Sequence, residues 1–180
     1  NHYTATAKAL HWLMALLLIG LVALGVYMHE LPLSPRKLQL YSWHKWAGVT
    51  VFLLMALRLA WRLGHRPPAL PETMPQLVRR VASATHALLY LLMFAIPLSG
   101  WLMSSAKGFQ TVYFGVLPLP DLLAKDAALG DALQQLHFGL NLLFAVLVIG
   151  HAGAALKHHF IDRDDILARM LPRRTQEKKS

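Results

Sequence analysis

The chain of 180 residues contains no cysteine and few charged side chains. Without cysteine it can form no disulfide, thiolate metal site, iron–sulfur cluster or covalently attached c-type haem. Charged residues make up 15% of the sequence and hydrophobic residues 56%. This balance is too apolar for a soluble domain of this length, so the composition indicates an integral membrane protein.

Four apolar stretches are free of internal charge runs. They cover residues 9–28, 43–63, 82–104 and 136–156, and each reaches the ~20 residues that cross the hydrocarbon of a bilayer. The first is longer than the apolar part of a typical signal peptide and ends in "VYMHELPLSP", without a small-residue cleavage site. We therefore expect a retained first helix and an all-α membrane protein, a bundle of four transmembrane helices.

Lysine and arginine are unevenly distributed between the two sides that this topology defines. Thirteen lie near the amino terminus, the second connection and the carboxy terminus: Lys8, Arg58, Arg62, Arg66, Arg79, Arg80, Lys157, Arg163, Arg169, Arg173, Arg174, Lys178 and Lys179. Five lie on the other side: Arg36, Lys37, Lys45, Lys107 and Lys125. Because basic residues favour the cytoplasmic side, both termini are predicted to be cytoplasmic.

The remaining segments indicate one domain. Residues 66–76 and 114–123 are proline-broken connections. We expect one transmembrane domain over residues 1–172, and a basic cytoplasmic tail over residues 173–180 that lies against anionic lipid or is disordered. The net charge of +9 follows from this topology, and without a basic stripe or a Gly-rich phosphate loop no nucleic-acid partner is expected.

Histidines recur within the predicted helices at two depths. His11 and His86 fall near the inner face, and His44 and His137 near the outer face. His151 lies in the inner half of the fourth helix, fourteen residues after His137. Fourteen residues rise ~21 Å and almost complete four helical turns, so both imidazoles leave nearly the same face of the helix.

Two layers of imidazoles predict two haem groups. A single transmembrane histidine is often a satisfied interhelical hydrogen bond, but ionisable groups at matched depths usually mark function. The outer layer is His44 with His137, and the inner layer is His151 with either His11 or His86. Two facing imidazoles match the axial ligation of haem b iron. Zinc requires three or four ligands around one point, so a metal or proton transporter is the weaker alternative.

The same fourteen-residue step predicts neighbours for the haems. From His11 it leads to Gly25 and from His86 to Gly100, at the depth of the outer haem. A missing side chain there allows a macrocycle to approach the backbone, although small residues are common at membrane helix interfaces. From His44 the step leads to Arg58, at the inner depth, where it pairs with a haem propionate or extends to the lipid head groups.

Several motifs together resemble the bacterial four-helix, di-haem cytochrome b561 family, which includes superoxide oxidases. They are "ALHWLMALLL", "YSWHKWAG", "RLAWRL", "HALLYLLMFAIPLSGW", "LHFGLN" and "GHAGAALKHHFIDRDDILARMLP". The resemblance implies that His11 and His151 hold the inner haem b and that His44 and His137 hold the outer one. It leaves His86 beside the inner haem or on the quinone side, and it implies a bacterial inner-membrane protein.

Such a protein must take its redox partners from outside the chain. The resemblance implies superoxide as electron donor and ubiquinone as acceptor. Arg36, Lys37 and Lys45 either steer an anion to the outer haem or anchor the helix beside the head groups. His86 and His158 are candidates to meet the quinone, since His158 lies two turns beyond His151. The alternative direction is quinol oxidation with electrons passed to a periplasmic partner.

Overall fold

Four long helices form the protein in this computed structural model, which describes residues 2–65, 67–69 and 74–171. The helices are α1 (Ala5–Glu30), α2 (Pro35–Gly64), α3 (Gln76–Ala106) and α4 (Ala127–Phe160). All four are long and apolar enough to span a membrane, which confirms the predicted fold class. The predicted tail, residues 173–180, and the boundary at residue 172 lie outside the described residues.

Each helix extends beyond its apolar stretch, and three of the four begin at a polar cap, whereas α3 begins after Pro75 without a side-chain cap. Thr4 accepts from the backbone N–H of Ala7 at 3.2 Å and starts α1. Ser34 caps α2, whose first residue is a proline, and Asp126 accepts from Leu129 to start α4. Side-chain oxygens at these positions satisfy amide groups that the first helical turn leaves free.

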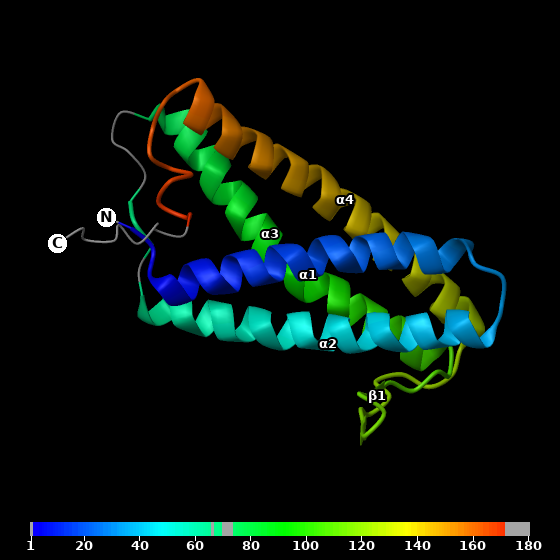
Figure 1. The fold of residues 1–180 in the computed structure, drawn as a ribbon. Helices are drawn as coiled ribbons and strands as arrows, with labels where there is room; N and C mark the ends of the chain where they lie inside the picture. Colours follow the sequence, from blue (N-terminus) through cyan, green and yellow to red (C-terminus); the bar gives the residue numbers. More distant parts are fainter. Residues whose placement is uncertain (1, 66, 70–73, 172–180) are drawn as a thin grey trace.

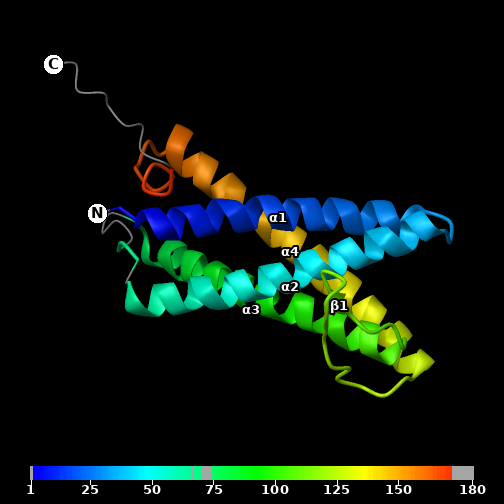
Figure 2. The ribbon, with the colours of Figure 1, turned by 60° about the horizontal axis from the view of Figure 1, so that its bottom comes forward.

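The helices are arranged as two antiparallel pairs that cross. α1 runs beside α2 and α3 beside α4, while α2 also packs on α3 (Figures 1 and 2). We call the end where α1 and α3 begin the terminal end, and the opposite one the loop end. After α4 the chain turns back to the start of α1, where Lys8 Nζ donates to the carbonyl of Leu171 at 2.9 Å.

A small β-hairpin covers α2 near the loop end (Figure 1). Its strands, β1 (Val112–Tyr113) and β2 (Leu117–Pro118), are antiparallel. The indole of Trp46 on α2 donates to the carbonyl of Val112 at 2.6 Å. The sequence predicted only an irregular segment here, because strands of two residues are too short to show an alternating pattern.

The buried core lies midway along the bundle, between the two predicted histidine layers. Val51 and Met55 of α2 are fully buried and pack with Met14 of α1. Phe144 of α4 is 5% exposed and packs with two buried leucines of α3. Phe144 lies seven residues from both His137 and His151. Two clusters of apolar side chains, contributed by all four helices, therefore lie between the two sets of imidazoles.

Candidate functional site

The outer histidine pair brings together α2 and α4. The ring centroids of His44 and His137 are 6.5 Å apart and their planes meet at 80°. Nδ1 of His137 lies 3.1 Å from the carbonyl of Ile96 and 2.9 Å from Oγ of Ser99. The carbonyl only accepts, so Nδ1 carries the proton and Nε2 presents its lone pair. A hydrogen bond of this kind fixes the tautomer of a metal-ligating histidine.

Ser99 was not identified from the sequence, although it immediately precedes Gly100. Its hydroxyl donates to the carbonyl of Ile96 at 2.7 Å, which leaves its oxygen lone pairs facing Nδ1 of His137. The residue is 4% exposed, so this contact is shielded from competing groups. A serine in a transmembrane helix commonly bonds a backbone carbonyl, and the sequence gives no sign that this one also supports a histidine on another helix.

Two glycines lie directly against the outer imidazoles. A Cβ atom at Gly25 would stand 3.4 Å from Cε1 of His44, and one at Gly100 would stand 3.2 Å from Cε1 of His137. The sequence placed both glycines at the outer depth, and the structure places each beside one ring. Their predicted contact with a macrocycle stays a prediction, whereas the close approach to the rings gives a second reason for glycine at both positions.

The inner layer contains three imidazoles. His11 of α1 and His151 of α4 have centroids 6.4 Å apart at 70°, and His86 of α3 lies 5.2 Å from His151. The structure thus brings both His11 and His86, the two candidates that helical spacing left open, next to His151. The centroid separation of His11 and His151 nearly equals that of the outer pair, His44 and His137. The centroids of His86 and His151 are closer together than those of either pair.

These separations can be compared with the span of a metal ion held by two imidazoles. A metal–nitrogen bond of about 2 Å on each side, plus about 1.1 Å from each nitrogen to its ring centre, puts the centroids about 6 Å apart. The His11–His151 and His44–His137 pairs match that span. In addition, Nδ1 of His44 is buried without a hydrogen-bond partner among the described residues. The residues present therefore fit axial ligation of haem iron.

Arg58 reaches the inner layer from α2. Its guanidinium donates to the hydroxyl of Tyr90 at 3.1 Å and to the carbonyl of Ala7 at 3.3 Å. A third contact joins it to Nδ1 of His11 at 3.3 Å. Guanidinium only donates, so Nδ1 of His11 accepts in this arrangement. The sequence predicted the depth of Arg58 but not its contact with a candidate ligand.

A small crevice opens beside Arg58 at the terminal end. Its volume is about 50 Å³, and Trp61, Arg62 and Tyr90 are among its lining residues. Tyr90 lies one helical turn after His86, and its hydroxyl contacts Arg58. Tyr90 was not identified from the sequence, although a hydroxyl four residues after an intramembrane histidine indicates that the two side chains share one face of the helix.

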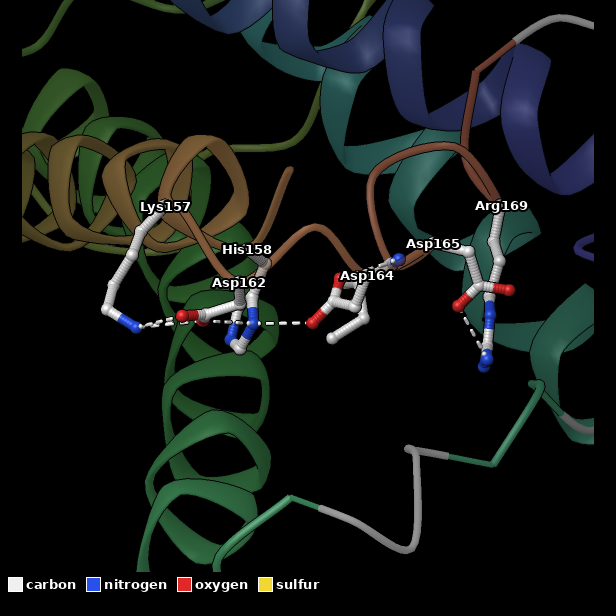
Figure 3. Close-up of polar contacts among 7 residues, drawn as sticks. Lys157, His158, Asp162, Asp164, Asp165 and Arg169 are labelled. Carbon is white, nitrogen blue, oxygen red and sulfur yellow. Dashed lines mark hydrogen bonds and ion pairs between the residues drawn. The ribbon is translucent and has the colours of Figure 1, made fainter. Parts of the chain in front are cut away.

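His158 is engaged at the end of α4. Its Nδ1 lies 2.8 Å from an oxygen of Asp164 and 3.0 Å from one of Asp162 (Figure 3). His86, the other quinone candidate, lies against His151 in the inner layer. The two candidates therefore occupy different surroundings, one among imidazoles and the other among carboxylates.

The three outer cations differ in their contacts. Lys37 donates to the carbonyl of Leu31 at 2.6 Å, and Lys45 donates to the carbonyl of Phe109 at 3.0 Å. Both lysines therefore tie loops to α2, a contact that neither the steering nor the head-group hypothesis predicted. Arg36 instead lines an open cavity of about 670 Å³ on α2.

Comparison with known proteins matches nearly the whole chain. The sequence pattern of the family described as prokaryotic cytochrome b561 covers residues 2–173. "Cytochrome b561 homolog 2" of Escherichia coli K12 is 38% identical, over 95% of this chain and 92% of the relative. "Cytochrome b561 homolog 1" of the same organism is 29% identical, over 97% and 99%. "Probable superoxide oxidase CybB" of Yersinia pestis is 30% identical, over 96% and 97%.

These matches agree with the paired imidazoles on four membrane-spanning helices. They favour electron transfer over the metal or proton transporter that the histidines alone left open. The chain belongs to the prokaryotic cytochrome b561 family, whose members bind haem b and transfer electrons in the membrane.

Proposed function

We propose that the chain binds two haem b groups, one between His11 and His151 and the other between His44 and His137. The observation that carries the proposal is the matched centroid separation of the two pairs, 6.4 and 6.5 Å. Bound haem supplies reversible one-electron chemistry, which no side chain at these sites offers. Placed one per end, the two pairs provide a route for electrons across the bundle.

The side chains around each pair have distinct tasks. Ile96 and Ser99 hold His137 with Nε2 free to bind iron. For His11 to bind through Nε2 as a neutral imidazole, its Nδ1 must carry the proton, which conflicts with the donor from Arg58 at 3.3 Å. Arg58 then turns away from Nδ1, and its guanidinium is free to pair with a propionate.

The reaction we propose is superoxide oxidation coupled to ubiquinone reduction. Two superoxide anions each lose one electron and become dioxygen, and one ubiquinone takes both electrons with two protons to become ubiquinol. We place the terminal end on the cytoplasmic side of a bacterial inner membrane, because basic residues are in excess there. Superoxide then reacts at the loop end, and the likeness to a probable superoxide oxidase supports this donor.

We place the quinone site at the terminal end for two reasons. Reduction of quinone consumes protons, and the inner histidine pair lies close to this end. His86 contacts His151, and His158 lies two turns further along α4. The crevice beside Arg58 and Tyr90 lies at the same end. Quinol oxidation toward a periplasmic partner would use the same two sites in the opposite direction.

The ligand assignment predicts which haem each histidine retains. Wild-type protein should contain two haem b groups per chain in a pyridine haemochromogen assay. His44→Ala or His137→Ala should leave only the inner haem, and His11→Ala or His151→Ala only the outer. His86→Ala should retain both, because the assignment gives this ring no iron. One haem in the wild type, or two in either α4 variant, would contradict the proposal.

Gly100→Ala should weaken the outer haem site. The new methyl group would lie 3.2 Å from Cε1 of His137 and tilt the ring. Overpacking of this kind costs about 1–3 kcal/mol, so haem retention during purification should fall several-fold. Gly20→Ala is the matched control, because a Cβ there has nothing within 4 Å. Equal haem content and equal reduced spectra in the two variants would exclude this steric role.

Arg36→Gln should slow reduction of the haems by superoxide. Steering by a surface cation is screened by salt, so the rate should also depend less on ionic strength. Arg36 is preferred over Lys37 and Lys45, whose ammonium groups hold loop carbonyls. Arg80→Gln makes the same charge change at an exposed position of the terminal end. The steering hypothesis fails if pulsed superoxide reduces both variants alike.

His86→Ala and His158→Ala test the quinone side. We expect full haem content but reoxidation of the reduced protein by ubiquinone slowed by about tenfold or more, because a positioned proton donor typically contributes at least that factor. His159→Ala, which removes the neighbouring imidazole, is the control. Stopped-flow absorbance of the haems gives the rate. Wild-type reoxidation in both variants would place the quinone elsewhere at the terminal end.

A further inference from the structure

A compact group of metal-binding side chains lies at the end of α4, outside both histidine pairs. It consists of His158, Asp162 and Asp164, whose ligand atoms all lie within 4.8 Å of one another. Nδ1 of His158 is 2.8 Å from Oδ2 of Asp164 and 3.0 Å from Oδ2 of Asp162. Figure 3 shows the two carboxylates facing the ring from the segment that follows the helix.

The local backbone brings these groups together. α4 ends at Phe160, and the chain turns so that Asp162 N donates to Lys157 O and Asp164 N to His158 O. Arg163 between them has φ of 54°, in the left-handed region that non-glycine residues rarely adopt. This turn directs the side chains before and after Arg163 toward the same imidazole.

We propose that His158, Asp162 and Asp164 form a binding site for a divalent transition-metal ion of the zinc type. The set offers one imidazole nitrogen and two carboxylate oxygens, which is a zinc donor set with a fourth position open to water. Ligand atoms around a tetrahedral ion with bonds of about 2.0 Å lie about 3.3 Å apart. The distances from Nδ1 to the two carboxylates, 2.8 and 3.0 Å, are slightly shorter than this, and the two carboxylates lie within 4.8 Å of each other, so modest shifts of these side chains admit the ion.

The protonation of the site is compatible with metal binding. Both carboxylates only accept, so the proton between them and His158 resides on Nδ1. An ion at Nδ1 replaces this proton, which is released or moves to Nε2. Lys157 hydrogen-bonds to Asp162 and holds the pKa of that carboxyl below its usual value, so Asp162 is available as an anion at neutral pH.

Lys157 is the internal competitor of the ion. Its Nζ lies 2.9 and 2.8 Å from the two oxygens of Asp162, and it supplies the positive charge that a metal would otherwise bring. Its side chain is 58% exposed, so the ammonium can move into solvent. Asp164 is already oriented, because its Oδ1 accepts from Ile166 N at 3.0 Å and Oδ2 faces the ring.

The test is zinc binding to the full chain with its haems, purified in detergent and stripped of metal by chelation. Zn²⁺ is titrated against a chromogenic chelator, and variants are compared because other histidines also take zinc. Asp164→Asn and His158→Asn should each lose one zinc equivalent or bind it at least tenfold more weakly. Lys157→Gln should bind that equivalent more tightly, since it removes the competing charge.

Asp165→Asn is the matched control. It neutralises Asp165, two residues after Arg163, which pairs with Arg169 at 2.8 Å and not with His158 among the described residues (Figure 3). If Asp164→Asn and His158→Asn bind zinc as Asp165→Asn does, the site is refuted. Zinc binding is measured without turnover, so its result is independent of whether superoxide and ubiquinone are the substrates.

Discussion

The arrangement depends on placing neutral imidazoles opposite one another inside an apolar bundle. A polar nitrogen in lipid is costly unless it is paired or ligated. α4 carries one histidine of each pair, His137 and His151, and each faces a ring from α2 or α1. The two antiparallel helix pairs therefore meet at two depths through polar side chains. The way the helix pairs cross determines how the two imidazoles of each pair face one another.

The apolar layer between the histidine pairs has a functional consequence. Val51 and Met55 are fully buried, and Phe144 lies equally far along α4 from both histidines. Apolar packing there disfavours water, so on the proposed function it would keep ions and protons from following the electron through the bundle. A protein that joins an outer one-electron donor to a proton-consuming acceptor requires that separation, because protons should enter only at the acceptor side.

The sequence predicted features that depend on repeats along one helix and missed those that depend on contacts between elements. Hydropathy and the fourteen-residue step located the helices and brought His137 and His151 to one face. The step also placed Arg58 at the inner depth, but its contact with His11 depends on how α1 packs against α2. The cluster around His158 was missed for a similar reason, since it forms only when the turn at Arg163 reverses the chain.

The two layers are electrostatically unequal, and the inequality agrees with electron flow toward the terminal end. At the outer pair, the contacts to His137 come from the neutral groups of Ile96 and Ser99. At the inner pair, Arg58 brings a guanidinium into the layer: without haem it lies 3.3 Å from His11, and on the proposed function it turns from Nδ1 toward a propionate. A fixed positive charge stabilises an added electron, and it does so more strongly where water is excluded. Any propionate that pairs with Arg58 offsets part of this effect. The remaining charge of the basic terminal end still acts in the same direction, so on the proposed function an electron entering at the loop end moves toward the more positive layer.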